Sequence, residues 1–561
     1  MRNSWRFNLV FFLLILLAGL VLMRLVYWQL VAGEKLALMA KNQYWSLLEI
    51  PAARGRILAR DGFSLAGNKT TYLIFALPKE IKIGINGLAA QLAEIIGEEE
   101  EVLKERLQRQ DLNWVPLKHR VSQEIKDAVE AKKVEGIGFM EEASRYYPEA
   151  SVAAQLLGFV GLDAQGKDRG YFGLEGEYDL ELRGKNGLVG REKDALNRPI
   201  LIGQVKEEKP KNGRDLLTTL DRGVQFLIEE KLKLGLKRYG AVSGSVVVME
   251  PQTGEVIGMA AFPSYDPANY TDFDRNLYVN PVVADAYEPG SILKVLIMAS
   301  ALDAGAVEAE TRCSRCAGPR EIGGYTLETW DKNYYPESTM REVIQHSDNV
   351  GMIFTAEELG KDKLLAYLKD FGLGKTVGID LQDEASPQLR PDKQWRSIDL
   401  ATASFGQGIA VTPIQMVQAV GAIANKGKMM RPFVVKEVIG EKGINQVKPV
   451  EVRQVIKPET AEITKEMMIN AVDQGEAKWA KLGEYRIAGK TGTAQIAVAG
   501  HYDEKKTIAS FIGFAPADEP KFVMLVTLRE PTSSPWGSET AAPLWFEIAK
   551  ELFTYYGSSP Q

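Results

Sequence analysis

The chain has very few of the residues on which metal and histidine chemistry depend. It carries three histidines and two cysteines in 561 residues, namely His119, His346, His501, Cys313 and Cys316. The sequence therefore offers few candidates for a histidine general base. The cysteines form one C-x-x-C pair, whereas structural zinc needs four ligands and a redox pair needs a thioredoxin-like context. We expect a reduced pair in a loop or a local disulfide, with no catalytic role, no metal site and no cofactor.

An excess of basic charge is also missing. Lysine and arginine number 68 against 74 aspartates and glutamates, which gives a net charge of −6. No long basic stripe interrupts this balance, so nucleic acid is excluded as the main partner. The length exceeds what one hydrophobic core supports, and two or more folded units are expected.

One segment lacks a polar face. Residues 9–31 are apolar apart from Arg24 and Gln29, and they are long enough to span a bilayer as a helix. The run exceeds the apolar core of a signal peptide, and no clear cleavage site follows it. Arg2 and Arg6 precede it and favour a cytoplasmic tail over residues 1–8. We therefore expect a single-pass anchor in the cytoplasmic membrane, with the rest of the chain outside.

The stretch EPGSILK, residues 288–294, is the first candidate for chemistry. Ser291 opens a long apolar run that predicts a buried helix ending near Gly305, with the serine at the N-terminus of that helix. Lys294 is expected one turn further along on the same face. An amine close to a hydroxyl can accept its proton if burial or neighbouring cations lower the amine's pKa. Taken alone, S-x-x-K is common, and a simple helix cap with a surface lysine explains it as well.

Two later motifs change this interpretation. Ser347-Asp348-Asn349 precedes a predicted helix, and Lys490-Thr491-Gly492-Thr493 lies in a predicted strand. The order S-x-x-K, S-D-N, K-T-G is typical of serine acyl-transferases of the penicillin-binding type. With these motifs the chain resembles a class B penicillin-binding protein, a monofunctional peptidoglycan D,D-transpeptidase, and most resembles the FtsI-type enzymes of septal wall synthesis in cell division.

The resemblance extends to residues 45–215, which it identifies as a pedestal domain of the penicillin-binding protein dimerisation type. Its motifs are Arg54-Gly55-Arg56, Ser144-Arg145-Tyr146-Tyr147-Pro148 and Gly173-Leu174-Glu175, and residues 86–135 have the pattern of a charged, helical, head-like insertion. Ala59 and Asp61 depart from the usual pattern of the first motif. The resemblance implies that Arg54, Arg56, Arg145 and Glu175 serve packing and domain linkage, not catalysis.

Residues 216–557 are expected to form the transpeptidase domain, with an α+β fold. A helix after Asp221 and a hairpin around residues 251–254 precede the serine motif. The K-T-G-T strand, a second hairpin around residues 515–520 and an apolar-faced helix close the chain. This order predicts one five-stranded antiparallel sheet covered by helices, with an all-helical lobe inserted between its second and third strands.

The resemblance also implies the roles of the motif residues. Ser291 attacks the carbonyl of the penultimate D-alanine of a stem peptide, Lys294 takes its proton and Ser347 relays protons to and from nitrogen. The amide of Asn349 holds substrate and Lys294, and Lys490 holds Ser347 and lowers the pKa of Lys294.

The K-T-G-T strand is expected to bind the substrate. Thr491 and Thr493 offer hydroxyls for the terminal carboxylate of the stem, and Gly492 lets its backbone lie along the strand edge. The resemblance also implies that the backbone N–H groups of Ser291 and Thr493 form the oxyanion hole.

Several alternatives share these motifs: an elongation-type transpeptidase, a D,D-carboxypeptidase, a β-lactam sensor and a silent scaffold. Glu384 follows Asn349 near the position of the deacylating glutamate in class A β-lactamases, but class B transpeptidases have a similar stretch without that role. No glycan-polymerase motif occurs, so we expect the chain to need a membrane glycan polymerase as partner. Its other expected ligands are stem peptides and β-lactams.

Overall fold

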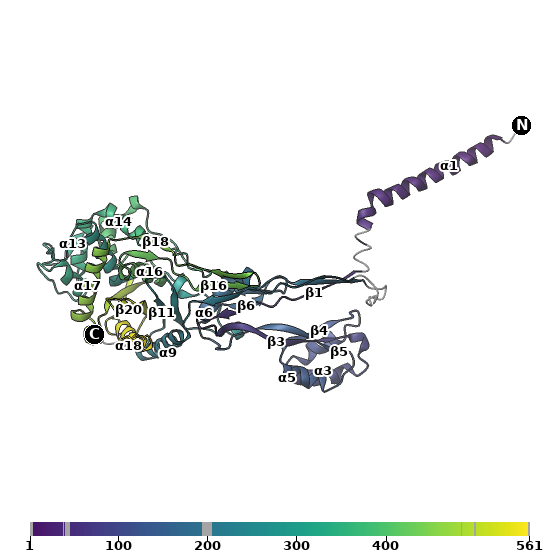
Figure 1. Ribbon diagram of the computed structural model, residues 1–561, viewed down its shortest axis with the longest axis horizontal. Helices are drawn as coiled ribbons and strands as arrows, with labels where there is room; N and C mark the ends of the chain where they lie inside the picture. Colours follow the sequence, from purple (N-terminus) through teal and green to yellow (C-terminus); the bar gives the residue numbers. More distant parts are fainter. Residues whose placement is uncertain are drawn as a thin grey trace. The chain divides into compact units, whose positions relative to one another are not determined.

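The computed structural model describes residues 4–36, 39, 45–192, 205–483, 485–498 and 501–558 (Figure 1). Arg2 of the expected cytoplasmic tail lies outside these ranges, and so do residues 193–204 of the expected pedestal. The chain divides into two compact units. The first comprises Met1–Ala53 and Arg183–Gly213, and the second comprises Arg54–Leu182 and Arg214–Gln561.

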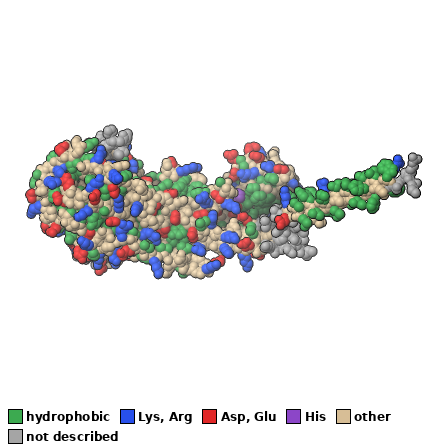
Figure 2. Space-filling model, turned by 90° about the horizontal axis from the view of Figure 1, so that it is seen from above, with side chains coloured by type: hydrophobic (Ala, Val, Ile, Leu, Met, Phe, Trp, Pro, Cys, Tyr) green, Lys and Arg blue, Asp and Glu red, His purple; other side chains and the backbone are tan. Residues whose placement is uncertain are grey.

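The first unit holds the apolar N-terminal segment and a small sheet. Helix α1, Ser4–Val26, continues into a π-helical turn, Tyr27–Val31. Over Trp5–Val31 the mean hydropathy reaches 2.9, and no other part of the protein covers the side chains. The helix therefore exposes mostly apolar side chains along its surface (Figure 2). Among the described residues it is the one helix long and apolar enough to cross a membrane. Strands β1 (Trp45–Ile50), β8 (Gly187–Glu192) and β9 (Val205–Glu208) form an antiparallel sheet in the order β1-β8-β9.

In the second unit, the pedestal part is built on a seven-stranded sheet. Its order is β17-β16-β10-β2-β3-β4, with β5 paired to β3. The bounds are β2 Ile57–Leu58, β3 Ser64–Ala76, β4 Val115–Val121, β5 Ile137–Tyr146, β10 Asp215–Thr218, β16 Val435–Gly440 and β17 Gly443–Gln446. Strand β16 lies more than 200 residues after its neighbour β10 in the sequence. Backbone hydrogen bonds between β10 and β16, and between β16 and β17, join residues 435–446 to the pedestal sheet.

The head-like insertion is confirmed, although it also contains β4. Its helices are α3 (Ile85–Ile96), α4 (Glu100–Leu107) and α5 (Gln123–Glu130). They bury an apolar cluster against β3 and β4 that includes Leu92, Leu103 and Leu117. The remaining short elements of this part are α6 Ala154–Leu157, β6 Phe159–Leu162, β7 Asp168–Tyr171, α7 Gly173–Glu177, α8 Asp179–Leu182 and the 3-10 turn Pro78–Glu80.

A buried ion cluster connects the three pedestal motifs. The carboxylate of Glu175, which is completely buried, accepts hydrogen bonds from Arg54 at 2.7 Å and from Arg145 at 2.6 Å. Arg54 also donates to Asp179 at 2.8 Å, and Arg145 donates to the carbonyl of Gly55 at 2.7 Å. Such groups are tolerated inside a protein only when they are paired. The cluster supports the expected packing role of these residues.

The transpeptidase part contains the five-stranded antiparallel sheet that the sequence predicts. Its order is β12-β11-β21-β20-β19, with bounds β11 Ser243–Met249, β12 Val256–Phe262, β19 Ala488–Val498, β20 His501–Ala515 and β21 Phe522–Arg529. Alternate residues of β11 face different cores. Val246 packs with the terminal helices α9 (Arg222–Tyr239) and α18 (Ala541–Tyr555), while Val247 packs with the helices inserted between β12 and β19 (Figure 1).

The inserted lobe is mainly helical, but the expectation that it is all-helical is wrong. Besides β16 and β17 it contains the hairpin β13 (Arg320–Ile322) and β14 (Tyr325–Leu327), and the pair β15 (Lys428–Met430) and β18 (Glu451–Gln454). These strands are only three to six residues long, so hydrophobic periodicity did not reveal them. The helices are α10 Pro281–Ala284, α11 Lys294–Asp303, α12 Met340–Gln345, α13 Asn349–Leu359, α14 Lys361–Asp370, α15 Ser397–Ala403, α16 Pro413–Ala424 and α17 Pro458–Gln474. The 3-10 turns are Pro267–Asp272, Arg275–Leu277, Gly290–Leu293 and Asp392–Gln394.

The two cysteines are bonded to each other. Cys313 and Cys316 form a disulfide in the segment between α11 and α12, and both side chains are buried. Of the two alternatives open at the sequence level, the local disulfide is therefore the one observed.

The buried ion cluster generates a stability prediction. Glu175→Gln keeps the volume but removes the charge that pairs Arg54 and Arg145, which should destabilise the protein by about 3–5 kcal/mol. The matched control is Arg56→Gln, because the Arg56–Asp215 pair has a 58% exposed arginine side chain and should contribute less than about 1 kcal/mol. Thermal unfolding of both variants checks this, and equal melting temperatures would contradict the role given to the cluster.

Candidate active site

Ser291 lies in a turn that the chain holds tightly against the sheet. The structure places it in the 3-10 turn Gly290–Leu293, and α11 begins only at Lys294, so Ser291 does not open the α-helix itself. Gly290 has φ +58° and donates its N–H to the carbonyl of Gly406 at 3.0 Å. A Cβ on Gly290 would come within 2.9 Å of the carbonyl oxygen of Thr493. Glycine is therefore required here, both by the backbone angle and by the close approach of β19.

Lys294 is completely buried, and its amine is held by the S-D-N motif. Its Nζ donates to the carbonyl of Ser347 at 2.5 Å, to the Ser347 hydroxyl at 3.2 Å and to Oδ1 of Asn349 at 2.8 Å. Burial, and after it the positive charge of Lys490, lower the pKa of Lys294 to about 7, although the charges of Glu476 and Asp348 oppose the shift. A lysine in this state can exchange a proton near neutral pH. The bond of Lys294 to Asn349 is the one that the motifs predict.

Backbone conformation fixes the S-D-N motif. Ser347, between α12 and α13, has φ +55°, which is unusual for a residue other than glycine. Asp348 then caps α13 by accepting the N–H of Val350 at 2.8 Å. Asn349 begins the helix and donates its side-chain amide to the carbonyl of Glu328 at 3.0 Å. That bond orients Oδ1 of Asn349 towards Lys294. Strained backbone of this kind is frequent at functional sites.

The K-T-G-T motif lies on β19, at the edge of the sheet. Lys490 is 3% exposed, and its amine donates to the hydroxyl of Thr491 at 2.9 Å. Burial lowers the pKa of Lys490, and Glu476 opposes that shift. A Cβ on Gly492 would meet Ile292 at 2.8 Å, so this glycine lets the strand approach the serine turn. The structure shows no hydrogen bond from Lys490 to Ser347 among the described residues. Lys490 therefore influences Lys294 through its field instead of through contact with Ser347.

The three motifs meet around one cavity of about 250 Å³. Ser291, Ser347, Asn349 and the strand residues Thr491, Gly492 and Thr493 line it, while Lys294 and Lys490 lie buried beneath. The motifs did not predict several further lining residues, and three of them make notable contacts. Trp330 and Trp536 are in edge-to-face contact, with ring centroids 5.2 Å apart, and Glu476 accepts the hydroxyl of Thr491 at 2.6 Å. No sequence pattern marks these residues, because each comes from a different segment of irregular structure.

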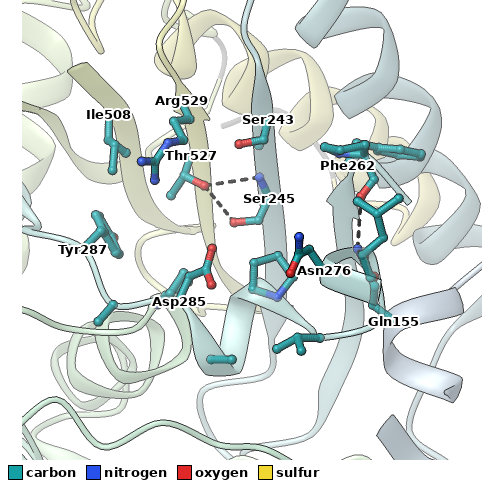
Figure 3. Close-up of a pocket in the computed structure, with 18 residues that line it drawn as sticks. Gln155, Ser243, Ser245, Phe262, Asn276, Asp285, Tyr287, Ile508, Thr527 and Arg529 are labelled. Carbon is teal, nitrogen blue, oxygen red and sulfur yellow. Dashed lines mark hydrogen bonds between the residues drawn. The ribbon is translucent and has the colours of Figure 1, made fainter. Parts of the chain in front are cut away.

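A larger cavity, of about 460 Å³, contains none of the motif residues. Hydroxyl groups of Ser245 and Thr527 share a 2.7 Å hydrogen bond on its wall, and Asp285 and Arg529 also line it (Figure 3). Burial raises the pKa of Asp285. Size therefore does not identify the reactive site; the clustered nucleophile, amines and hydroxyls do.

Glu384 is not a lining residue of the serine cavity in the part of the chain that the structure describes. Its carboxylate instead accepts backbone N–H groups of Val377 and Gly378 and closes a loop. The structure therefore gives no support to a deacylating role. No group of three metal-ligating side chains occurs among the described residues either.

The comparisons with known proteins concern nearly the whole chain. Residues 244–553 match the penicillin-binding protein transpeptidase domain, and residues 49–218 match the penicillin-binding protein dimerisation domain. The chain is similar to Stage V sporulation protein D of Bacillus subtilis, at 35% identity over 98% of this chain and 86% of the relative. It is similar to peptidoglycan D,D-transpeptidase FtsI of Escherichia coli, at 30% identity over 97% and 91%. Penicillin-binding protein 3 of Mycobacterium tuberculosis, solved with aztreonam, matches with a TM-score of 0.70 and 25% identity over 92% and 98%.

The position of Lys490 predicts a shift in the pH dependence of acylation. Transfer of an acyl group from a small activated ester to Ser291 needs neutral Lys294, so its rate should rise with pH through about 7. Lys490→Gln removes a positive charge that lowers the pKa of Lys294, and the rising limb should therefore move to higher pH. Stopped-flow acylation from pH 5 to pH 10 measures this. A limb that stays in place or moves to lower pH would contradict the coupling.

Proposed function

We infer that this chain, which belongs to the class B penicillin-binding proteins, is a peptidoglycan D,D-transpeptidase that works through a serine acyl-enzyme. One observation carries the inference: the buried amine of Lys294 is bonded to Ser347 and Asn349, and these two residues line one cavity together with Ser291 and the K-T-G-T strand. This is the set of groups that acyl transfer needs, namely a nucleophile, a base that is neutral near pH 7 and proton-relaying hydroxyls.

In the first half-reaction, Ser291 Oγ attacks the carbonyl of the penultimate D-alanine of a donor stem. Lys294 takes the hydroxyl proton, and Ser347 passes a proton to the nitrogen of the leaving terminal D-alanine as the amide bond breaks. In the second half-reaction, the amine of a neighbouring stem attacks the ester. It gives up a proton along the same path, and the Ser291 hydroxyl is restored. Throughout, Asn349 orients the amine of Lys294 by accepting its hydrogen bond, and the charge of Lys490 lowers the pKa of that amine.

The strand residues form the donor subsite in this proposal. The hydroxyls of Thr491 and Thr493 face the stem's terminal carboxylate, and the backbone N–H groups of Ser291 and Thr493 bind the developing oxyanion. A methyl group on Gly492 would collide with Ile292, so glycine here keeps β19 close to the serine turn, and the stem backbone lies along the edge of that strand. The field of buried Lys490 favours an anionic group at this place.

The cellular setting is also a proposal. Helix α1 supports a single-pass membrane anchor, with residues 1–8 inside the cell and the catalytic part outside. The two matched domains account for acyl transfer and a dimerisation-type pedestal, and in this proposal a separate membrane polymerase supplies the glycan chains. The likeness to FtsI supports a role in septal wall synthesis during cell division.

A penicillin should label one residue only. We expect a fluorescent penicillin to acylate Ser291 in the full-length protein, because the β-lactam carbonyl would occupy the place of the donor carbonyl. Peptide mapping by mass spectrometry identifies the labelled residue. Ser291→Ala should lose the label and keep its melting temperature. Label on another residue, or no label on the wild type, would refute the assignment.

Cross-links should form only beside a working polymerase. With lipid-linked precursor and a membrane glycosyltransferase, the full-length protein should produce dimeric muropeptides, which chromatography and mass spectrometry detect. Ser291→Ala is the control for the background of the glycosyltransferase. Glycan polymer made by this protein alone would refute the monofunctional assignment.

The same assay separates the carboxypeptidase alternative. If the protein releases free D-alanine without dimers while acceptor stems are present, water is the acceptor and the D,D-carboxypeptidase alternative holds. Glu384→Gln should leave the ratio of dimers to released D-alanine unchanged, because its carboxylate only closes a loop.

A further inference from the structure

Glu476 introduces a negative charge where the proposed donor binds its own negative group. It follows α17 and precedes the K-T-G-T strand, and among the described lining residues of the serine cavity it is the one with an ionisable acid. Its Oε2 lies 2.6 Å from the hydroxyl oxygen of Thr491. No motif of the transpeptidase pattern includes this residue.

The hydrogen bonds around Thr491 run in one direction. Lys490 Nζ donates to the Thr491 hydroxyl at 2.9 Å, and that hydroxyl donates to Glu476. A hydroxyl has a single proton to donate, so Thr491 can serve either Glu476 or a bound carboxylate at one time. Thr493 differs, because its hydroxyl accepts the N–H of Gly537 at 2.9 Å and keeps its own proton.

We propose that Glu476 is a specificity-determining residue that competes with the donor's terminal carboxylate for the Thr491 hydroxyl. In the free enzyme Glu476 occupies that hydroxyl and offsets part of the positive field of Lys490. An anionic donor or β-lactam must displace Glu476 and bind close to its charge, whereas a donor without a carboxylate meets no such opposition. The inference rests on the proposed function, because it assigns the carboxylate subsite to Thr491 and Thr493.

Two other partly buried carboxylates of this domain, those of Glu384 and Asp380, accept hydrogen bonds from backbone N–H groups. Glu384 accepts N–H groups of its own loop, and Asp380 accepts those of Val434 and Val435 at 2.7 and 2.8 Å. The hydrogen bond that the structure gives Glu476 is instead to a side chain of the reactive motif. Its charge also raises the pKa of both Lys294 and Lys490, against the effect of burial. Removing the charge should therefore affect the chemistry as well as the selectivity.

The test compares benzylpenicillin with its uncharged methyl ester. Second-order acylation constants are measured on the full-length protein in detergent for the wild type, Glu476→Gln and Glu476→Ala. Glutamine can still accept the Thr491 hydroxyl but carries no charge. We expect Glu476→Gln to raise the ratio of the benzylpenicillin constant to the ester constant by at least about fivefold. Glu476→Ala, which also frees the hydroxyl, should raise it as much or more.

A second readout separates this role from a structural one. With the ester, which has no carboxylate to compete, the rising limb of acylation against pH should move to lower pH in Glu476→Gln, because the pKa of Lys294 falls when a nearby negative charge is lost. The matched control is Glu384→Gln, which removes a carboxylate outside the cavity and should change neither the ratio nor the limb. If Glu476→Gln melts early, Glu476→Asp keeps the charge with a shorter reach and should give an intermediate ratio.

The outcomes are distinguishable. An unchanged or lower ratio in a Glu476→Gln protein that is still acylated at Ser291 overturns the competition and leaves the proposed function intact. A wild type that neither compound acylates at Ser291 overturns the proposed function itself. A ratio that rises equally in Glu384→Gln would show a general charge effect and would also overturn the proposal.

Discussion

The arrangement of this site depends on keeping one lysine amine out of water. Lys294 is completely buried, and its three hydrogen bonds all go to the S-D-N segment. Burial penalises the charged form, and a second buried amine, Lys490, adds repulsion, so the pKa of Lys294 falls to about 7. An exposed lysine would remain an ammonium at this pH. The proton acceptor for Ser291 therefore exists only because the fold encloses it.

That enclosure needs three segments that are far apart in the chain. The serine turn and the start of α11 bring Ser291 and Lys294, the start of α13 and the residues before it bring Asn349 and Ser347, and the edge strand of the sheet brings Lys490. They approach closely because glycine replaces side chains at both contacts between the turn and β19. The lobe is in turn attached to the pedestal sheet through β16. A distortion of the pedestal can therefore reach the lobe that supplies Ser347 and Asn349.

Much of this architecture could be predicted, and the exceptions share a cause. The sheet, the terminal helices and the positions of Ser347 and Lys490 on a loop and a strand follow from periodicity and motif order, whereas Ser291 lies in a 3-10 turn and not at the start of the α-helix. The short strands of the lobe did not follow from the sequence, because three to six residues are too few to establish a hydrophobic period. The sequence also did not reveal Glu476 or the contact between Trp330 and Trp536. These residues reach the site only through the tertiary fold, and no local sequence pattern predicts which distant residues the fold brings together.

The central claim is that Lys294 is neutral in a large share of molecules near pH 7. The most direct measurement is the titration of its ε-carbon by NMR, in full-length protein with ε-¹³C-labelled lysine, assigned by comparison with Lys294→Arg. The structure predicts a midpoint near 7 that moves up when Lys490 is replaced by glutamine. A midpoint near 10.5, the ordinary value for this side chain, would contradict the account.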